Sequence, residues 1–442
     1  MSPHALGDSV KRVTSDNVVR IGVLGFGNVG SALVQLVQRQ SAAIERSTGI
    51  CLEVTRVAVR NMSKTRDVEL PVGMLTRNAA DVVDDPNVDI IVELIGGIEP
   101  ARELILTALG KGKPVVTGNK ELLATLGAEL YEAADRHGVD LLFEAAVAGG
   151  IPIIRPLRES LRGEPIRRVM GIVNGTTNYI LTKMTEDGAN YNDALADAQR
   201  LGFAERDPTA DVEGYDAGAK AAIIASIAFG TKVVAGDVYH EGISNITAGD
   251  IAMAKRLNHT IKLLAICEQD AESYEVTVRV HPALVPNTHP LASVRDSYNA
   301  VFVEGDAVGS LMFYGRGAGG LPTASAVLGD LIDAAVNLRN GSHAPIGTFG
   351  RAQTRGIDDT VAQYQLALVV ADRPGVLATV AGVLASHGIS VRTAEQDGSG
   401  PSATLVFITH SAREADMQAT VRELRTLDVV TSVSGLLRVI ES

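Results

Sequence analysis

The chain has 442 residues, enough for about three domains of ordinary size, each with its own hydrophobic core. Its 40 lysines and arginines are outnumbered by 52 aspartates and glutamates, and the net charge of −12 argues against a broad surface for nucleic acid or anionic membrane. With 2 cysteines no disulfide framework or zinc cluster can form, and no apolar run approaches the ~18 residues of a membrane helix. We therefore expect a soluble cytoplasmic protein with a flexible tail over residues 1–17, whose partners are small molecules or further subunits.

From Val18 the chain reads VVRIGVLGFGNVGSALVQLVQRQ, which predicts a buried strand, a glycine turn and an amphipathic helix. Gly25, Gly27 and Gly30 have the G-x-G-x-x-G spacing that lets the backbone approach a pyrophosphate at a helix N-terminus. A turn that only links strand to helix is the alternative, but the context favours dinucleotide binding.

The next strand, LEVTRVAVRN, should end near Arg60, where NAD-specific sites commonly carry an acidic residue for the adenosine ribose. Arg60, followed by Asn61, Ser63 and Lys64, would instead suit a 2′-phosphate, so NADP is favoured and NAD is not excluded. A solvated basic loop is the open alternative, because one chain fixes a strand end only to within a few residues.

Further apolar strands are expected at 88–96, 113–119 and 140–147, each after a helix-like segment. This alternation predicts an α/β fold with a parallel, doubly wound Rossmann-type sheet over residues 18–150. Lys120 directly follows the strand at 113–119 and would face the nicotinamide, since ligands bind beyond the C-terminal strand ends. Its alternative is an ordinary surface lysine at a helix start.

The character changes after residue 150, and we place an α+β substrate and dimerisation domain at 151–314. The small polar residues of its turn-rich block GIVNGTTNYI are Asn174, Thr176, Thr177 and Asn178. They would bind substrate or nicotinamide, or equally cap a helix over 178–186. A helix-like stretch at 248–267 and strands at 277–285 and 299–305 follow.

The block LGFAERDPTADVEGYDAGAK gathers acidic residues and one lysine among glycines. Its charged members considered for a site are Glu205, Asp207, Asp211, Asp216 and Lys220. Such a cluster can grip an ammonium group and move a proton. Asp216 and Lys220 are four residues apart and share one helix face, and the alternative is a surface i,i+4 salt bridge.

A Gly-rich loop and helix at 315–337 should pack back on the nucleotide domain, with Gly317, Gly319 and Gly320 near the cofactor. Residues 338–360 are polar and aperiodic and read as a linker. The rest, 361–442, predicts a self-contained βαββαβ unit with an antiparallel sheet, two helices on one face and no catalytic cluster.

The motifs GFGNVG, VVTGNK, EAAVAGGIP, GIVNGTTNYIL and LGFAERDPTADVEGYDAGAK together resemble homoserine dehydrogenase, in order across about 320 residues. The segment ADRPGVLATVAGVLASHGISV resembles an ACT domain, a module that often binds an amino acid. No aspartate-kinase region precedes these motifs, so the resemblance is to the monofunctional form.

The resemblance implies NAD(P)-dependent interconversion of L-homoserine and L-aspartate 4-semialdehyde in threonine, methionine and isoleucine biosynthesis. Lys220 matches the family's proton donor, with Lys120 as the second candidate for acid–base catalysis. The expected substrate-binding residues are Glu205, Asp211, Asp216, Asn174 and Thr176. The expected cofactor-binding residues are Gly25, Phe26, Gly27, Asn28, Val29, Gly30, Arg60, Lys64, Lys120, Gly202 and Gly320.

The resemblance also implies a monovalent cation, sodium, held mainly by backbone carbonyls in the segment EAAVAGGI. By register the ligands are Glu144, Val147, Gly149 and Ile151. Only Glu144 offers a side-chain oxygen, so spacing alone does not reveal such a site.

For the ACT-like tail we expect L-threonine as effector, bound at a turn whose helix N-terminus can receive a carboxylate. The expected contact residues are Asp372, Pro374, Gly375, Val376 and Leu377. Tails paired between subunits of a homodimer or homotetramer would transmit the effect, and a ligand-free dimerisation module is the alternative.

Other classes remain open. A cysteine-dependent aldehyde dehydrogenase is disfavoured, because Cys51 begins a strand and Cys267 is expected inside a helix, neither being placed as a nucleophile. A non-catalytic nucleotide-sensing regulator explains both ends of the chain but not the block at 205–220. An NADP-dependent dehydrogenase of another small amino acid is the remaining rival.

Overall fold

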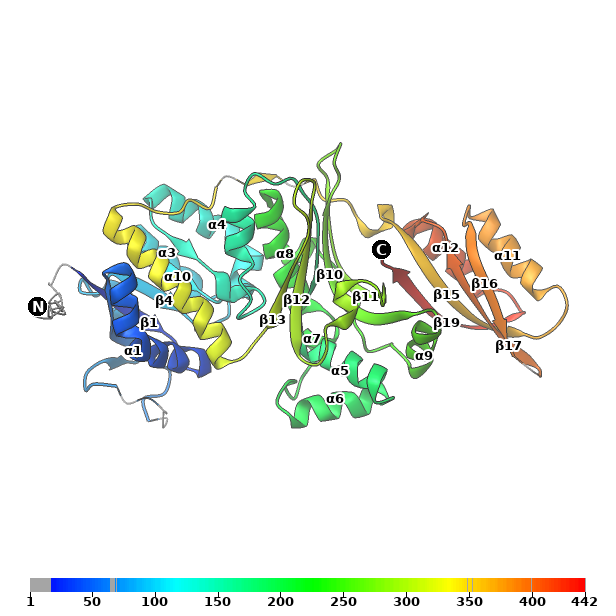
Figure 1. Cartoon of the computed structure of the whole chain (residues 1–442), viewed down its shortest axis with the longest axis horizontal. Helices are drawn as coiled ribbons and strands as arrows, with labels where there is room; N and C mark the ends of the chain where they lie inside the picture. The colour runs from blue at the N-terminus through cyan, green and yellow to red at the C-terminus, as the bar shows by residue number, and fades with distance from the viewer. Residues whose placement is uncertain are drawn as a thin grey trace, which may run out of the picture. The chain divides into compact units, whose positions relative to one another are not determined.

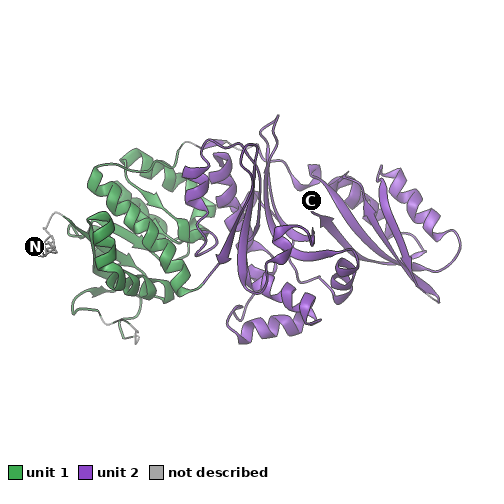
Figure 2. Cartoon of the chain, viewed as in Figure 1, with its two compact units in different colours: residues 1–146, 319–347 green, residues 147–318, 348–442 purple. Residues whose placement is uncertain are grey.

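The computed structural model describes residues 17–63, 68, 70–347, 349–351, 353–398 and 400–441. It separates into two compact units, one made of residues 1–146 and 319–347 and the other of 147–318 and 348–442 (Figures 1 and 2). The expected N-terminal tail, except for its last residue, and Lys64 lie outside the described residues. In the described part of the chain, no helix is long and apolar enough to cross a membrane.

The first unit is built on a parallel sheet with strand order β3-β2-β1-β4-β5-β6, which confirms the doubly wound prediction. Its strands are β1 (Val18–Leu24), β2 (Cys51–Ala58), β3 (Leu75–Thr76), β4 (Ile90–Glu93), β5 (Val115–Thr117) and β6 (Leu141–Leu142). Its helices are α1 (Asn28–Thr48), α2 (Ala80–Asp84), α3 (Ala101–Gly110), α4 (Lys120–His137) and α10 (Gly320–Asn340). The order steps outward from β1 in both directions, which places the ends of β1 and β4 at the point where ligands of such sheets bind.

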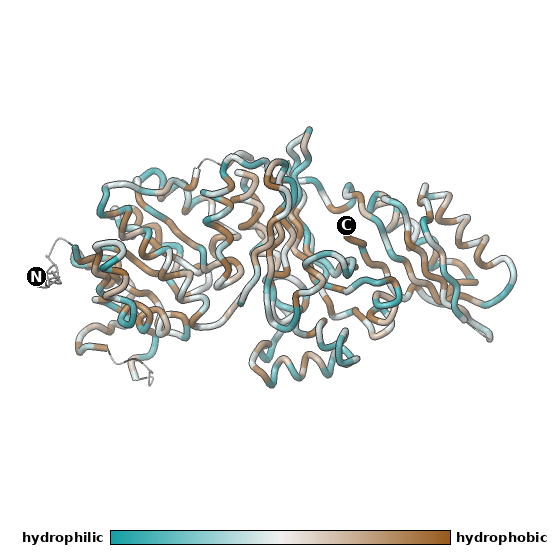
Figure 3. Tube along the Cα trace, viewed as in Figure 1, coloured by the Kyte–Doolittle hydropathy of each residue, from teal (hydrophilic) through white to brown (hydrophobic). Residues whose placement is uncertain are grey.

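Helix α10 completes this unit, although it comes almost two hundred residues after α4. Val327 and Leu331 of α10 are buried in one core with Leu33 of α1 and Val23 of β1. The apolar face of α10 therefore belongs to the nucleotide-binding fold, as the sequence predicted. Hydrophobic residues likewise gather along the central strands (Figure 3).

The second unit contains an eleven-stranded sheet whose main path runs β13-β12-β7-β10-β11-β19-β15-β17-β16. Its first part has β7 (Ile166–Ile172), β9 (Tyr239–His240), β10 (His259–Gln269), β11 (Val276–Pro286), β12 (Tyr298–Gly305) and β13 (Gly309–Arg316). The helices of that part are α5 (Gly175–Glu186), α6 (Tyr191–Arg200), α7 (Thr209–Val212), α8 (Tyr215–Phe229) and α9 (Ala248–Arg256). Helix α8 packs against β10 and β11, so the sheet supports the helix that carries the acidic–lysine block.

The C-terminal part has the predicted βαββαβ order, with a short extra strand before its second helix (Figure 1). Its elements are β15 (Val361–Ala371), α11 (Val376–Ser386), β16 (Val391–Asp397), β17 (Ser402–Thr409), β18 (Ala412–Arg413), α12 (Glu414–Leu424) and β19 (Val430–Val439). Val380 of α11 and Met417 of α12 share one core with Leu366 and Leu368 of β15.

This C-terminal part is not self-contained, because β19 pairs in parallel with β11 through Ala283 with Arg438 and Leu284 with Val439. The buried Arg438 guanidinium donates two hydrogen bonds of 2.8 Å to Glu414 and one of 2.7 Å to Glu241. Burial raises the pKa of Glu414, but hydrogen bonds from Arg438 outweigh it and leave that pKa below its ordinary value. One strand pairing and one ion network thus tie the tail to the substrate-domain sheet.

The structure corrects several element predictions. The stretch 248–267 is not one helix, since α9 ends at Arg256, Asn258 takes a positive φ of 58°, and strand β10 begins at His259. The central residues of β10, 261–267, are all buried, and a short run that is buried on both faces has no period that separates strand from helix. Cys267 therefore lies on a strand.

The boundaries of other elements also differ from those predicted. The predicted strand at 140–147 is a two-residue strand followed by a 3-10 turn at Glu144–Ala146, and the helix expected from 178 begins at Gly175. Residues 315 and 316 end β13 instead of opening the loop before α10. Within 338–360, α10 continues to Asn340 and a short strand, β14 (Gly350–Arg351), pairs with β8 (Thr231–Lys232).

Candidate active site

The acidic–lysine block forms a buried ion pair on α8. Lys220 Nζ lies 2.6 Å from Asp216 Oδ2, and the two side chains are only 10% and 8% exposed. The ammonium also donates to the Val173 carbonyl oxygen at 2.7 Å. A surface i,i+4 salt bridge would be exposed and worth little, so burial argues against that alternative.

Asn174 joins this pair from the start of α5. Its amide nitrogen donates to Asp216 at 2.9 Å and to Asp211 at 2.7 Å, while its oxygen accepts the Thr177 N–H at 2.9 Å. Asn174 is thus both the helix cap that the sequence suggested and a member of the polar cluster. Four residues from three segments, Asn174, Asp211, Asp216 and Lys220, meet at one place.

Thr176 and Asn178 make hydrogen bonds to neighbouring loops. Thr176 donates to the Phe203 carbonyl at 2.7 Å and holds the loop after α6 in place. The Asn178 amide donates to the carbonyls of Asp296 at 2.9 Å and Tyr298 at 3.2 Å, which fastens α5 to the loop before β12.

Not all acidic residues of the block join the cluster. Asp207 is exposed and accepts the backbone and hydroxyl hydrogens of Thr209, as a turn residue does. Glu205 is also exposed, and its backbone carbonyl accepts from Gln199 at 3.0 Å. Gly202 lies in the same exposed turn.

His240 of β9 supports α8 from outside the polar cluster, a role the sequence did not reveal. Its ring lies 5.2 Å from the Tyr215 ring, and a Cβ added to Gly218 would come within 1.9 Å of its Nε2. Burial lowers the pKa of His240, so the ring stays neutral at neutral pH. Gly218 lies between Asp216 and Lys220, and its lack of a side chain lets β9 approach the helix here.

In the first unit, the glycine turn has the geometry of a phosphate site. Gly25 has φ of 101°, and a Cβ there would lie 2.6 Å from the Leu94 carbonyl oxygen, so only glycine fits. A Cβ on Gly30 would lie 2.4 Å from the Gly25 carbonyl oxygen, whereas Gly27 faces open space. No acidic residue occupies the first turn of α1, which leaves its N-terminus suited to an anion.

The other expected cofactor residues surround this turn or follow the strand ends. Phe26 is buried, Asn28 opens α1 with Val29 beside it, and a Cβ on Gly320 would lie 3.3 Å from the Asn28 carbonyl oxygen. Arg60 is exposed just beyond the end of β2. Lys120 is the first residue of α4, directly after β5.

Glu93, at the end of β4, is a residue the sequence reasoning missed. Its buried carboxylate accepts the Ile95 N–H at 2.7 Å, the Gly96 N–H at 3.1 Å and the Thr117 hydroxyl at 2.6 Å. It therefore fixes the loops after β4 and β5 that precede Lys120. The available signal was an acidic residue that directly follows the apolar run IIV at 90–92.

The expected cation ligands fall in both units, Glu144 in the first and Val147, Gly149 and Ile151 in the second. Glu144 is buried, and its N–H donates to Asp330 of α10 at 2.7 Å. Among the residues described, no group of three or more His, Cys, Asp or Glu side chains could hold a metal ion.

The cysteines have no features of a nucleophile. Burial raises the pKa of the Cys267 thiol to about 12, and burial also raises that of Cys51. Neither lies at a helix N-terminus. This disfavours aldehyde–acid chemistry through a thiohemiacetal.

A parallel sheet with a glycine turn at a helix N-terminus, and a second fold carrying a buried carboxylate–lysine pair, define a nicotinamide-dependent oxidoreductase. Residues 25–144 match the family model for the homoserine dehydrogenase NAD-binding domain, 152–332 that for homoserine dehydrogenase, and 364–429 that for the ACT domain. The chain belongs to the homoserine dehydrogenase family.

Individual relatives match most of the chain. The homoserine dehydrogenase of Corynebacterium glutamicum is 51% identical over 426 residues, 96% of each chain. A crystal structure of a homoserine dehydrogenase from Thiobacillus denitrificans superposes with a TM-score of 0.90 at 41% identity, covering 96% of this chain and 98% of that one. A hyperthermophilic archaeal homoserine dehydrogenase in complex with NADPH gives a TM-score of 0.61 at 30% identity, covering 72% of this chain and 98% of that one.

Replacing Gly218 by alanine tests the support of the ion pair. We expect Gly218→Ala to lower the free energy of unfolding by about 1–3 kcal/mol and to reduce turnover, because the new methyl group must displace His240 or α8. Chemical denaturation and initial rates measure the two effects. Gly382→Ala, on an open face of α11, is the matched control and should do neither. If the double variant Gly218→Ala with His240→Ala recovers neither stability nor turnover, the clash with His240 is not the cause of the losses.

Proposed function

We propose that the chain interconverts L-homoserine and L-aspartate 4-semialdehyde, with NADP(H) as the preferred cofactor. The observation that carries the proposal is the buried Asp216–Lys220 pair, bonded to Asn174 and through it to Asp211. A carboxylate cluster around one ammonium suits a substrate that has its own α-ammonium group and an oxygen that gains or loses a proton.

Lys220 is the proposed acid–base residue. When bound, the nicotinamide supplies or accepts the hydride at the substrate carbon. Lys220 gives a proton to the substrate oxygen as the aldehyde is reduced and takes it back as the alcohol is oxidised. Asp216 holds the ammonium by its 2.6 Å contact, and Val173 aligns it through a carbonyl. Lys120 remains the second candidate for this step.

The other site residues have supporting roles. Asp211 and Asp216, with Glu205 from the adjacent loop, would receive the substrate α-ammonium. Asn174 orients both buried carboxylates, and Thr176 holds the loop that carries Gly202 and Glu205.

The nicotinamide cofactor is proposed from the glycine turn, and the preference for NADP from Arg60. The glycine turn and the N-terminus of α1 would hold the pyrophosphate, with Gly320 closing the back of the turn. Arg60 stands just beyond β2, where a 2′-phosphate would lie, and a solved relative was determined in complex with NADPH. We further propose a sodium ion on Glu144 and the carbonyls of Val147, Gly149 and Ile151.

L-threonine is the proposed effector, received at the start of α11. Gly375 caps this helix in a left-handed conformation with φ of 91°, and Asp372 and Leu377 are exposed on either side. We infer a cytoplasmic homodimer or homotetramer, since both cysteines are free thiols and ACT-type sheets offer edges for pairing.

Removal of either lysine tests the proton transfer. We expect Lys220→Ala or Lys120→Ala to lose about 10²–10⁴ in kcat while the protein still folds, because general acid–base catalysis is lost. NADPH absorbance with aspartate semialdehyde measures it. Lys183→Ala, which breaks an exposed i,i+4 pair with Asp187, is the control and should keep its rate. Near-normal kcat in both test variants would exclude the mechanism, and a raised KM alone would indicate a binding role.

Arg60→Ala tests cofactor choice. We expect NADP(H) to bind about 10–100-fold more weakly and NAD(H) to change little, because a charge-assisted phosphate contact is lost. The matched control is Arg77→Ala, another exposed arginine of this unit. If the substitution weakens the binding of both cofactors equally, Arg60 does not recognise the 2′-phosphate.

Gly375→Asp tests regulation by threonine. We expect basal activity to persist and threonine inhibition to weaken at least about tenfold, since a carboxylate at the helix start repels that of the ligand. Gly388→Asp is the matched control, because Gly388 lies beyond the other end of α11 and also has a positive φ, of 72°. This variant should still be inhibited by threonine. Wild-type enzyme indifferent to millimolar threonine would end the hypothesis. A truncation after residue 345 is a poorer test, because it would strip β19 from β11.

A further inference from the structure

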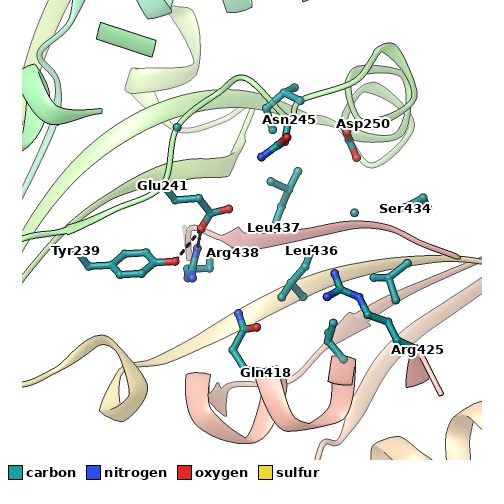
Figure 4. Close-up of a pocket in the computed structure, with 15 residues that line it drawn as sticks. Tyr239, Glu241, Asn245, Asp250, Gln418, Arg425, Ser434, Leu436, Leu437 and Arg438 are labelled. Carbon is teal, nitrogen blue, oxygen red and sulfur yellow. Dashed lines mark hydrogen bonds and ion pairs between the residues drawn. The ribbon is translucent and has the colours of Figure 1, made fainter. Parts of the chain in front are cut away.

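A cavity of about 410 Å³ lies within the second unit, where the ACT part meets the substrate domain (Figure 4). Its walls come from the loop after β9, the start of α9, helix α12 and strand β19. The volume is in the range of small-ligand sites. It is separate from the Asp216–Lys220 cluster and from the turn before α11, none of whose residues line it.

Residues of opposite charge line two sides of the cavity. The substrate-domain wall carries Glu241 and Asp250, and the α12 wall carries Arg425 (Figure 4). Asp250 uses Oδ2 to accept from the Thr247 N–H at 2.9 Å and hydroxyl at 2.6 Å. Among the described residues, neither Oδ1 of Asp250 nor the Arg425 guanidinium has a hydrogen-bond partner.

Arg438 adds no free charge to the cavity. Its guanidinium is saturated by two bonds to Glu414 and one to Glu241 Oε2, which also faces the Tyr239 hydroxyl. The cavity therefore offers carboxylate oxygens on one side and a single available guanidinium on the other. This suits one molecule with an ammonium group and a carboxylate, and it disfavours a dicarboxylate or a diamine.

The cavity wall is also in contact with the catalytic helix. Tyr239 and Glu241 line the cavity, while His240 between them presses on α8 at Gly218. The Glu241 N–H donates to Val280 at 2.8 Å, and the Ile243 N–H donates to the Val212 carbonyl just before α8 at 2.8 Å. A shift of Glu241 would thus move His240 against the turn that holds Asp216 and Lys220.

We propose that this cavity binds a free α-amino acid as its zwitterion, and that its occupancy acts on α8 through β9. Arg425 takes the carboxylate, and Glu241 and Asp250 take the ammonium. The site is a second one, distinct from the turn at 372–377, and only its effect on turnover rests on the proposed function.

Calorimetric titration of the full-length chain carrying Gly375→Asp with individual proteinogenic amino acids tests the binding. We expect at least one to bind, with affinity reduced about 10–100-fold by Arg425→Gln and by Glu241→Gln. Arg422→Gln, in the last turn of α12 just before Arg425 but outside the cavity, is the matched control. The corresponding amino alcohol, which lacks the carboxylate, should bind the Arg425→Gln variant as well as the amino acid does. If Glu241→Gln does not fold, the comparison of Arg425→Gln with Arg422→Gln decides the test alone.

Absence of binding by every amino acid at about 10 mM, or affinity unchanged by Arg425→Gln, would overturn the site. A ligand that binds here but leaves kcat and KM unchanged would overturn its action on α8. Calorimetry does not depend on catalysis, so a chain without dehydrogenase activity would refute the proposed function and leave the cavity test intact.

Discussion

The buried ion pair between Asp216 and Lys220 is the interaction on which the substrate unit depends. The free energy lost when two charges are removed from water exceeds the free energy gained from their attraction, unless further hydrogen bonds complete the network. Asn174 and the Val173 carbonyl supply those bonds, and both come from the segment that joins β7 to α5. The sheet, α5 and α8 must therefore assemble together before the lysine is held in one position.

The same helix also lies at the end of a series of contacts between the two halves of the second unit. β19 extends the substrate-domain sheet by pairing with β11, and Arg438 on β19 reaches Glu241 beside β9. His240 continues this chain of contacts to Gly218 of α8. The C-terminal part is therefore connected to α8 by a continuous series of contacts within one chain.

The sequence predicted what depends on local pattern. The glycine turn, the parallel strands, the shared face of Asp216 and Lys220 and the βαββαβ order all follow from periodicity and spacing, and the structure confirms them. It did not predict β10, because a run buried on both faces has no period, nor β7 and β13, whose pairing is set by distant strands. His240, Glu93 and the β11–β19 junction come from tertiary contacts that no short motif encodes.

A double-mutant cycle with Asp216→Asn and Lys220→Met tests most directly whether the pair acts as one catalytic unit. The quantity to measure is kcat/KM for aspartate semialdehyde in the wild type, both single variants and the double variant, with folding checked by thermal unfolding. We expect each single substitution to lower kcat/KM about 10²-fold or more, and the double variant to be hardly less active than the less active single variant. Losses that multiply, or single variants with near-normal kcat/KM, would contradict it.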